Sequence, residues 1–301
     1  MYDIIIIGAG PAGMTAAIYA RRAAKTVLVL EASAYGGQII NTPDIENYPV
    51  AAHISGFDFA TNVYNQAVAL GAEFKFEKVI ELKNGENEKT VFTAKNEYNS
   101  KAVIIATGSK NRKLGVEEED KLIGRGISYC ATCDGAFFRN KSVAVVGGGN
   151  TALEDALYLA DIANTVYLIH RRDSFRGEAA TVQQLKEKPN VEFVLNSVVK
   201  KLNADKRLNS VEVENKNGEV RTLEVSGLFA AVGRIPETDI FDEVADIDGS
   251  GYISASEDCK TKTDGVFVAG DVRAKEVRQL VTAASDGAVA ATEAVKYING
   301  N

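Results

Sequence analysis

The hydrophobic positions of the chain repeat one arrangement in its two halves. Each half begins with an apolar, β-branched run and continues with a glycine-rich turn, a helix-like segment and a second apolar run. In the first half the apolar run lies at 3–7, the glycine turn at 8–13, the helix-like segment extends to about 22, and the second apolar run lies at 26–30. In the second half the same segments lie at 142–146, at 147–152, up to about 160, and at 165–169. The residue after the second run stands 23 positions beyond the first glycine in both halves, since 31 − 8 equals 170 − 147. The pattern predicts two βαβ units in one register.

Further apolar segments extend each unit into a sheet. The strands of the βαβ units are continuous rather than alternating apolar runs, which favours parallel sheets covered on both faces. Alternating segments near 74–93 and 191–224 predict antiparallel meanders, with turns at Asn84-Gly85 and Asn217-Gly218. Buried strands that lead into glycine then close the two halves, at 103–108 and 228–233.

A third strand of this kind, at 266–270, and an Ala-rich helix from about 279 to 297 belong to neither repeat. The simplest assembly returns both to the first half, so that the second half is an insertion. We therefore predict an α/β fold of two nucleotide-binding, three-layer domains of the ββα, Rossmann-like type. The first domain is discontinuous and comprises residues 1–113 and 241–301. The second domain is inserted into it and comprises residues 114–240, and the chain crosses between the two near 113–119 and 238–241.

Composition and charge narrow the classes of function. The 301 residues are 46% hydrophobic and 25% charged, which is typical of a globular protein of two domains. The formal net charge of −7 argues against a nucleic-acid partner, because such proteins normally present a basic face. No stretch approaches the roughly 20 apolar residues that span a bilayer, and no secretory leader precedes the first strand. We expect a cytoplasmic protein without a membrane partner.

The two glycine-rich turns predict dinucleotide sites. A lone GxGxxG is a weak signal, but here each one follows an apolar strand and opens a helix. In that context one glycine makes the turn, one admits a pyrophosphate to the backbone, and one allows the helix to pack closely on the strand. The helix N-terminus then faces the phosphate charge. A purely structural role for the glycines is the alternative.

The residue after the second strand distinguishes the two ligands. Glu31 can accept a hydrogen bond from a ribose hydroxyl, so the first turn suits the adenosine of FAD or NAD. The second unit has His170-Arg171-Arg172 at this point, with Arg176 one helical turn onward. Guanidinium groups recognise a 2′-phosphate through paired, charge-assisted hydrogen bonds, which favours NADPH over NADH. A solvated basic loop is the alternative interpretation.

Cys130-Ala131-Thr132-Cys133 is the candidate redox centre. A CxxC at a helix start brings both sulfurs within bridging distance, and the helix N-terminus lowers the pKa of a thiol. Zinc is disfavoured because the chain offers only scattered Cys259, His53 and His170 to complete four ligands, and we predict no metal site. Two unreactive core cysteines are the other alternative. Asp134 follows directly and is either a proton donor and acceptor or a helix cap.

With these residues placed, the chain resembles the low-molecular-weight, bacterial-type thioredoxin reductase family along essentially its whole length. The segments that carry the resemblance are Gly8 to Gly13, Gly36-Gly37-Gln38, Glu46-Asn47-Tyr48-Pro49, Ala106-Thr107-Gly108, Cys130 to Gly135, Gly147 to Ala152, His170 to Arg176 and Ala269-Gly270-Asp271. The segment 233–238, which varies in the family, is a small departure. The position of the CxxC separates this family from flavoproteins that place the dithiol near the first glycine turn.

The resemblance implies a two-dinucleotide flavoprotein that acts as a homodimer. It implies FAD in the discontinuous domain, bound by Gly8, Gly10, Pro11, Ala12, Gly13, Glu31, Gly36, Gly37, Gln38, Asn47, Ala106, Gly108, Gly270, Asp271, Arg278, Gln279 and Leu280. It implies NADPH in the inserted domain, bound by Gly147, Gly149, Asn150, Thr151, Ala152, His170, Arg171, Arg172, Arg176 and Gly233. Catalysis is assigned to Cys130, Cys133 and Asp134.

The resemblance also implies the order of electron transfer. Hydride passes from NADPH to FAD, electrons pass to the Cys130–Cys133 disulfide, and thiol–disulfide exchange reduces thioredoxin. Cys133 is expected nearer the flavin, and Cys130 attacks the substrate. Both nicotinamide and disulfide belong to the inserted domain yet must approach the flavin closely, so we expect that domain to rotate between half-reactions. Ferredoxin-dependent and peroxiredoxin-type disulfide reductases of the same fold, and a redox sensor without turnover, are the alternatives.

Overall fold

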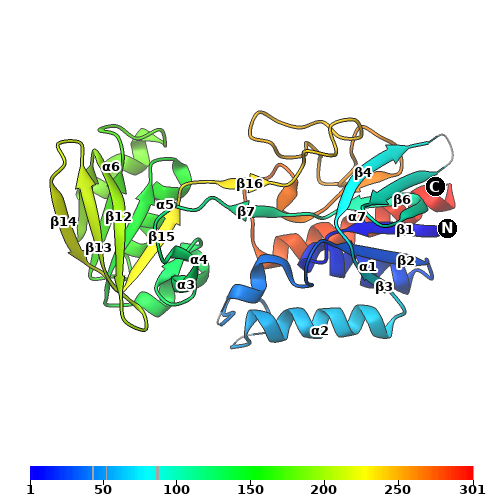
Figure 1. Cartoon of the computed structure of the whole chain (residues 1–301), viewed down its shortest axis with the longest axis horizontal. Coiled ribbons are helices and arrows are strands. Elements are labelled where there is room, and N and C mark those ends of the chain that lie inside the picture. The colour runs from blue at the N-terminus through cyan, green and yellow to red at the C-terminus, as the bar shows by residue number, and fades with distance from the viewer. Residues whose placement is uncertain (43, 52, 86–87, 301) are drawn as a thin grey trace. The chain divides into compact units, whose positions relative to one another are not determined.

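The computed structural model describes residues 1–42, 44–51, 53–85 and 88–300. These residues form two compact units, the first made of 1–110 with 235–301 and the second of 111–234 (Figure 1). The boundaries predicted from the sequence lie between residues 113 and 114 and between residues 240 and 241. No helix in the described part of the chain is long and apolar enough to cross a membrane.

The first unit is built on one mixed sheet in the order β3-β2-β1-β6-β5-β4, with β17 paired to β6. Its strands are β1 (Tyr2–Ile7), β2 (Val27–Glu31), β3 (Glu73–Phe76), β4 (Val79–Asn84), β5 (Lys89–Thr93), β6 (Glu97–Ile105) and β17 (Val266–Val268). Its helices are α1 (Pro11–Arg22), η1 (Gly37–Asn41), α2 (Gly56–Ala69), η3 (Gly270–Val272) and α7 (Leu280–Asn299). β1 is parallel to both β2 and β6, and β17 is parallel to β6.

Successive residues of the central strands face opposite layers of the first unit. Ile4 and Ile6 of β1 pack with α1, α2 and α7, while Ile5 and Ile7 pack with the layer on the other face. Each of these isoleucines is at most 4% exposed. Burying one such side chain stabilises the fold by about 1.5–3 kcal/mol, so an apolar run on both faces specifies a central strand.

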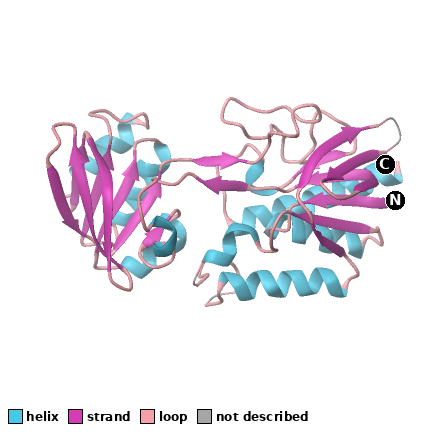
Figure 2. Ribbon diagram, in the orientation of Figure 1, coloured by secondary structure: helices cyan, strands magenta, loops and turns pink. Residues whose placement is uncertain are grey.

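The second unit has the same three-layer plan. A parallel sheet in the order β11-β10-β9-β15-β8 lies between helices and a separate antiparallel sheet, β12-β13-β14 (Figure 2). The strands are β8 (Ile127–Ser128), β9 (Ser142–Gly147), β10 (Thr165–His170), β11 (Val191–Leu195), β12 (Ser197–Ala204), β13 (Leu208–Asn215), β14 (Val220–Glu224) and β15 (Gly227–Ala231). The helices are α3 (Glu119–Leu122), α4 (Ala131–Asp134), η2 (Gly135–Phe138), α5 (Asn150–Ala160) and α6 (Ala179–Glu187). The predicted fold class is confirmed.

The predicted meanders were partly wrong. β3 and β11 were assigned to antiparallel meanders, but β3 is parallel to β2 and β11 is parallel to β10. Each follows a helix, α2 or α6, that carries the chain back across the sheet, and such a crossover returns a strand in parallel. The remaining strands of both segments are antiparallel as predicted. The turn at Asn84-Gly85 leads into 86–87, outside the described residues.

The chain passes between the units twice. The crossings are β7 (Ser109–Asn111) and β16 (Arg234–Pro236), which pair with each other as a two-stranded sheet. The second unit is therefore a single insertion in the first, and two adjacent extended segments connect the two units (Figure 1). Hinges commonly consist of a few residues in loops or at the ends of elements, and both crossings are short segments of this kind.

Candidate active site

The first glycine turn has the geometry that a dinucleotide requires. A Cβ on Gly8, whose φ is +109°, would lie 2.3 Å from Ala106 O, and one on Gly13 would lie 1.9 Å from Gly8 O. A Cβ on Gly10 would meet no atom within 4 Å. Two glycines are thus needed for packing, whereas the third leaves open space. α1 begins at Pro11 with no side-chain cap, so its first N–H groups are available to a diphosphate.

Glu31 lies at the end of β2, beside this turn. Its Oε2 accepts a hydrogen bond from Ala9 N at 2.8 Å, and its Oε1 accepts one from Ser33 N at 3.0 Å. The two bonds hold the carboxylate against the glycine turn. This is the position from which an acidic residue reaches the ribose of a nucleotide.

The structure brings the other predicted FAD residues to the same end of the sheet. A Cβ on Gly37 would lie 3.2 Å from Gly10 Cα, and Gly36 N donates to Ala9 O at 2.8 Å, so the loop before Gln38 touches the glycine turn. Asn47 Nδ2 donates to Gln279 Oε1 at 3.2 Å. Segments distant in sequence therefore meet around one site of the first unit.

Residues that follow β6 and β17 complete this end of the first unit. Ala106 N donates to Ile7 O at 2.8 Å, and Gly108 adopts a φ of +69°. A Cβ on Gly270 would lie 2.7 Å from Ala12 Cβ, so the turn after β17 touches α1. Gln279 caps α7 through a reciprocal pair of hydrogen bonds with Thr282, directly before Leu280. The chemistry and space of this set fit a dinucleotide such as FAD.

The second glycine turn repeats the first. A Cβ on Gly147 would lie 2.4 Å from Ala231 O and 2.6 Å from Ala152 Cβ, whereas one on Gly149 would meet nothing within 4 Å. α5 begins at Asn150 without a side-chain cap, followed by Thr151. This turn has the same free N–H groups and open space, so it also fits a dinucleotide.

The side chain of His170 packs against the second glycine turn. Its ring occupies the space beside Gly148, where a Cβ would lie 2.1 Å from the ring, and it stacks on Phe175 at 5.1 Å between centroids. Its Nε2 lies 3.1 Å from Ser174 O. Burial lowers the pKa of His170, so the ring stays neutral near pH 7. The imidazole thus shapes the loop on which the arginines stand.

The three predicted arginines of this loop are exposed to solvent. Arg171 and Arg172 follow β10, and Arg176 N donates to Gly148 O at 2.8 Å, which ties the end of the loop to the glycine turn. The loop that carries the three arginines is therefore held beside the second glycine turn. Their guanidinium groups can form bidentate hydrogen bonds with a phosphate.

Cys130 and Cys133 form a disulfide, as predicted. The sulfur atoms are 2.09 Å apart and the two Cα atoms 5.3 Å apart. Cys130 has extended backbone and precedes α4, whose first residue, Ala131, is fully buried against α5. The buried anchor fixes the short helix, while the disulfide at its start joins the two ends of the motif.

Asp134 is a desolvated carboxyl group next to the disulfide. Its Oδ2 accepts a hydrogen bond from Ser128 Oγ at 2.5 Å, and its Oδ1 is buried with no hydrogen-bond partner among the described residues. Burial raises the pKa of Asp134. The helix-cap alternative was wrong, because the Asp134 side chain caps no N–H group of η2. A carboxyl that holds its proton more tightly is suited to proton transfer.

Sequence reasoning missed two residues around the CxxC. Ser128 is the hydrogen-bond donor to Asp134, and Asp155 of α5 accepts from the backbone N–H of Ala131. Burial, with a smaller contribution from the charge of Glu154, raises the pKa of Asp155 to about 7. Two adjacent acidic residues, Glu154 and Asp155, between the buried positions of α5 were the available signal.

Cys259 has the properties of a structural thiol. It is 1% exposed, and burial raises its pKa to about 12. Its Sγ donates to Asp286 O at 3.7 Å. A thiol in this environment is not a nucleophile near neutral pH, so the chemistry rests on Cys130 and Cys133.

Two dinucleotide-binding units, one of which contains a CxxC disulfide, define a class of protein: oxidoreductases that exchange electrons between a nucleotide and a disulfide. A family model for pyridine nucleotide-disulphide oxidoreductases matches residues 2–288. The chain belongs to this family, whose members of this type use FAD and NADPH. The predicted cofactors are thereby confirmed.

Known relatives make the resemblance specific. Thioredoxin reductase of Treponema pallidum is 42% identical over 99% of this chain and 97% of its own length. Thioredoxin reductase of Listeria innocua is 43% identical over 99% of this chain and 94% of its own length. The crystal structure of thioredoxin reductase from Streptococcus pyogenes is 41% identical, covers 100% of this chain and 99% of its own, and has a TM-score of 0.96. The predicted resemblance to bacterial-type thioredoxin reductases is confirmed.

Proposed function

We propose that this protein reduces thioredoxin with electrons from NADPH. The observation that supports the proposal most is the disulfide between Cys130 and Cys133, at the start of α4 in a unit whose glycine turn and arginines suit NADPH. FAD, when bound, supplies the two-electron transfer that links the nucleotide to the disulfide. Thioredoxin has a potential near −270 mV, so its reduction calls for a donor as strong as NADPH.

The dithiol acts in two steps. Two electrons break the Cys130–Cys133 bond and leave a thiolate on Cys133 and, after one proton is taken up, a thiol on Cys130. Cys130 then gives up this proton and attacks the thioredoxin disulfide as a thiolate, which forms a mixed disulfide and releases one thioredoxin sulfur that takes the proton up. Cys133 attacks Cys130 in turn, which restores the original bond and releases the second thiolate. We assign these roles by the resemblance.

Nucleotide binding is divided between the units. We assign FAD to the turn Gly8–Gly13 with its surrounding loops, and NADPH to the turn Gly147–Ala152 with Arg171, Arg172 and Arg176. The open space at Gly10 and Gly149, and the helix N-termini beside them, support this division. By the same resemblance we propose a cytoplasmic homodimer.

One titration tests the function. NADPH is added anaerobically to the yellow protein, and bleaching of the flavin is followed before thioredoxin and a thiol-sensitive dye are added. Bleaching followed by dye reduction supports the proposal. A ferredoxin-dependent reductase would not bleach, a redox sensor would not turn over, and a peroxiredoxin-type reductase would need a different protein substrate. Failure to reduce any thioredoxin would reject the proposal.

Asp134→Asn is expected to lower the rate of thioredoxin reduction by about 10²-fold, the lower end of the contribution of general acid–base catalysis. Because burial raises the pKa of Asp134, the carboxyl donates its proton at low pH and loses this ability as the pH rises through that pKa. The rate of the wild-type protein should therefore show a limb that falls with pH, and the variant should lack it. Stopped-flow measurements between pH 5 and 9 check this, with Asp205→Asn, an exposed aspartate on the turn between β12 and β13 of the second unit, as the control.

We infer that β7 and β16 form a hinge about which the second unit moves between half-reactions. A covalent crosslink between the units is expected to reduce turnover by about tenfold or more, since hinge motions set the rate of many such enzymes. FAD content should not change. The comparison is a crosslink within the first unit alone, and unchanged turnover in fully crosslinked protein would refute the hinge.

A further inference from the structure

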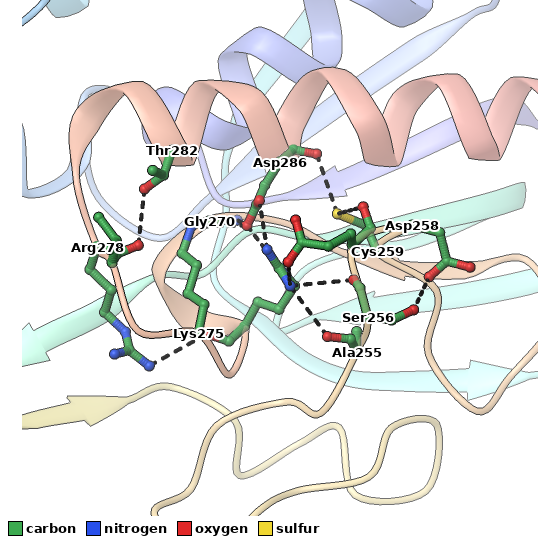
Figure 3. A network of polar contacts seen from close by, with 12 residues as sticks. Ala255, Ser256, Asp258, Cys259, Gly270, Lys275, Arg278, Thr282 and Asp286 are labelled. Atoms are coloured by element: carbon green, nitrogen blue, oxygen red, sulfur yellow. Dashed lines mark hydrogen bonds and ion pairs between the residues drawn. The ribbon is translucent and has the colours of Figure 1, made fainter.

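A single buried carboxylate of α7 joins three other groups of the first unit. Asp286 Oδ2 accepts hydrogen bonds from Gly270 N, Arg273 Nε and Lys275 Nζ, each at 3.0 Å, and Oδ1 accepts one from Arg273 Nη2, also at 3.0 Å. Figure 3 shows Asp286 reaching from the helix toward Gly270 and Lys275. The residue is 6% exposed. Such a saturated, buried carboxylate fixes its partners in one geometry.

The cluster carries more positive than negative charge. The side chains of Arg273 and Lys275 are 5% and 8% exposed, and they share the one carboxylate of Asp286, so the buried charges sum to +1. Arg273 Nη1 also lies 3.5 Å from Glu257 Oε1, but that side chain is 96% exposed and is screened by water. Burial opposes ionisation of Asp286, yet the hydrogen bonds from Arg273 and Lys275 outweigh it and lower its pKa.

The cluster holds the turn that lies against the first glycine site. Gly270 begins η3, directly after β17, and its N–H is one of the donors to Asp286. A Cβ on Gly270 would lie 2.7 Å from Ala12 Cβ, and one on Gly287 would lie 2.2 Å from Ala12 O. The turn and α7 therefore both pack on the first turn of α1, where the diphosphate of a dinucleotide is expected.

Arg278 holds the other end of the segment 270–279. Arg278 Nε donates to Asp271 O at 3.4 Å, and Arg278 Nη2 donates to Arg273 O at 3.5 Å. The Arg278 guanidinium also lies over the ring of Tyr252, 4.0 Å from its centroid. Asp286 and Arg278 thus fix the two ends of the segment 270–279, which contains four of the residues assigned to FAD.

We propose that Asp286 is a positioning residue for FAD. Through its bonds with Gly270 N–H and Arg273, it sets the place of the η3 turn and so presents Gly270 and Asp271 to the cofactor. Its effect is preorganisation, because the turn needs no ordering when FAD binds. The inference rests on the assignment of FAD to the first unit.

A double variant separates position from charge. Lys275→Met with Asp286→Asn keeps the buried charge at +1, on Arg273, but removes the carboxylate that holds the turn. The dissociation constant for FAD, measured by flavin fluorescence on titration of the apoprotein, should rise by about tenfold or more. The absorption bands of the FAD that remains bound should shift, because its surroundings are less fixed.

Two single variants serve as controls. Lys275→Met alone keeps the bonds from Gly270 and Arg273 to Asp286, and its dissociation constant should stay within about threefold of wild type. Asp258→Asn alters a half-exposed aspartate of the same region, whose Oδ1 accepts a hydrogen bond from Ser256 Oγ at 2.7 Å, and should change nothing (Figure 3). A large loss in Lys275→Met instead would mean that charge, not position, determines affinity, and would overturn the proposal.

The outcomes distinguish the positioning role of Asp286 from the assignment of FAD to the first unit. Double-variant protein that binds FAD within twofold of wild type would overturn the positioning role. Wild-type protein that takes up no FAD would reject the assignment itself. If the apoprotein of the double variant does not fold, refolding it with excess FAD allows the rate of FAD release to be compared with that of wild-type holoenzyme, and equal rates would count against the proposal.

Discussion

Cys130→Ser is expected to lower the rate of thioredoxin reduction by about 10³-fold or more, since it removes the attacking nucleophile of the reaction. Reduction of the flavin by NADPH should survive, because that step precedes the dithiol and involves the nucleotide sites alone. The variant also cannot form the disulfide with Cys133, so electrons that reach the flavin have no protein acceptor. Steady-state dye reduction measures the loss, and anaerobic bleaching by NADPH measures the step that remains.

The chain offers a matched control for this variant. Cys259→Ala removes a thiol whose pKa burial raises to about 12, and it leaves the CxxC untouched. Its rate of thioredoxin reduction should equal that of the wild type, although its stability will fall slightly because a small buried group is lost. If Cys259→Ala abolished turnover and Cys130→Ser did not, the assignment of the redox centre would be wrong.

Replacing Arg171 and Arg172 together with glutamine is expected to raise the KM for NADPH by about 10- to 100-fold. A hydrogen bond to a charged group contributes about 1.5–3 kcal/mol, and exposure to solvent places these two arginines at the lower end of that range. The KM for NADH should hardly change, because NADH has no 2′-phosphate. The ratio of the two kcat/KM values, measured by the initial rate of dye reduction, is therefore the informative quantity.

The control for this pair is Arg207→Gln, an exposed arginine of the second unit on the turn between β12 and β13. It alters the net charge of the unit in the same direction as each single change. Long-range attraction of an anionic nucleotide would be weakened in both variants, and this part of the effect disappears in high salt. An equal loss of NADPH preference in Arg207→Gln would show that the second site reads overall charge and not the 2′-phosphate.

Most of the fold could be predicted because its signals are local. A continuous β-branched run, a glycine turn and a helix define a βαβ unit within about thirty residues, and the fold uses that unit twice. Parallel pairing of β3 and β11 could not be predicted in this way. Each is a short strand whose partner lies across a helix, and its alternating pattern is equally compatible with an antiparallel neighbour.

The chemistry of the site divides along the same line. The CxxC and the arginines could be proposed as site residues from the sequence because their residue types and spacing are specific. Asp134 was ambiguous, since a carboxylate after a helix start can cap or titrate, and the sequence shows neither the bond from Ser128 nor the absence of a capping bond. Asp286 was missed, because its partners Arg273 and Lys275 are brought together by a turn that the sequence does not specify.

The discontinuity of the first unit has a consequence for synthesis of the chain. β17 and α7, which complete its sheet and cover its helical face, leave the ribosome only after the whole of the second unit. The second unit is continuous and can fold earlier, because domains generally fold as units. Until α7 emerges, Ile6 and Ile104 lack their full cover on one face of the sheet. One face of the sheet of the nascent first unit therefore stays partly exposed until α7, which is synthesised after the whole of the second unit, packs on it.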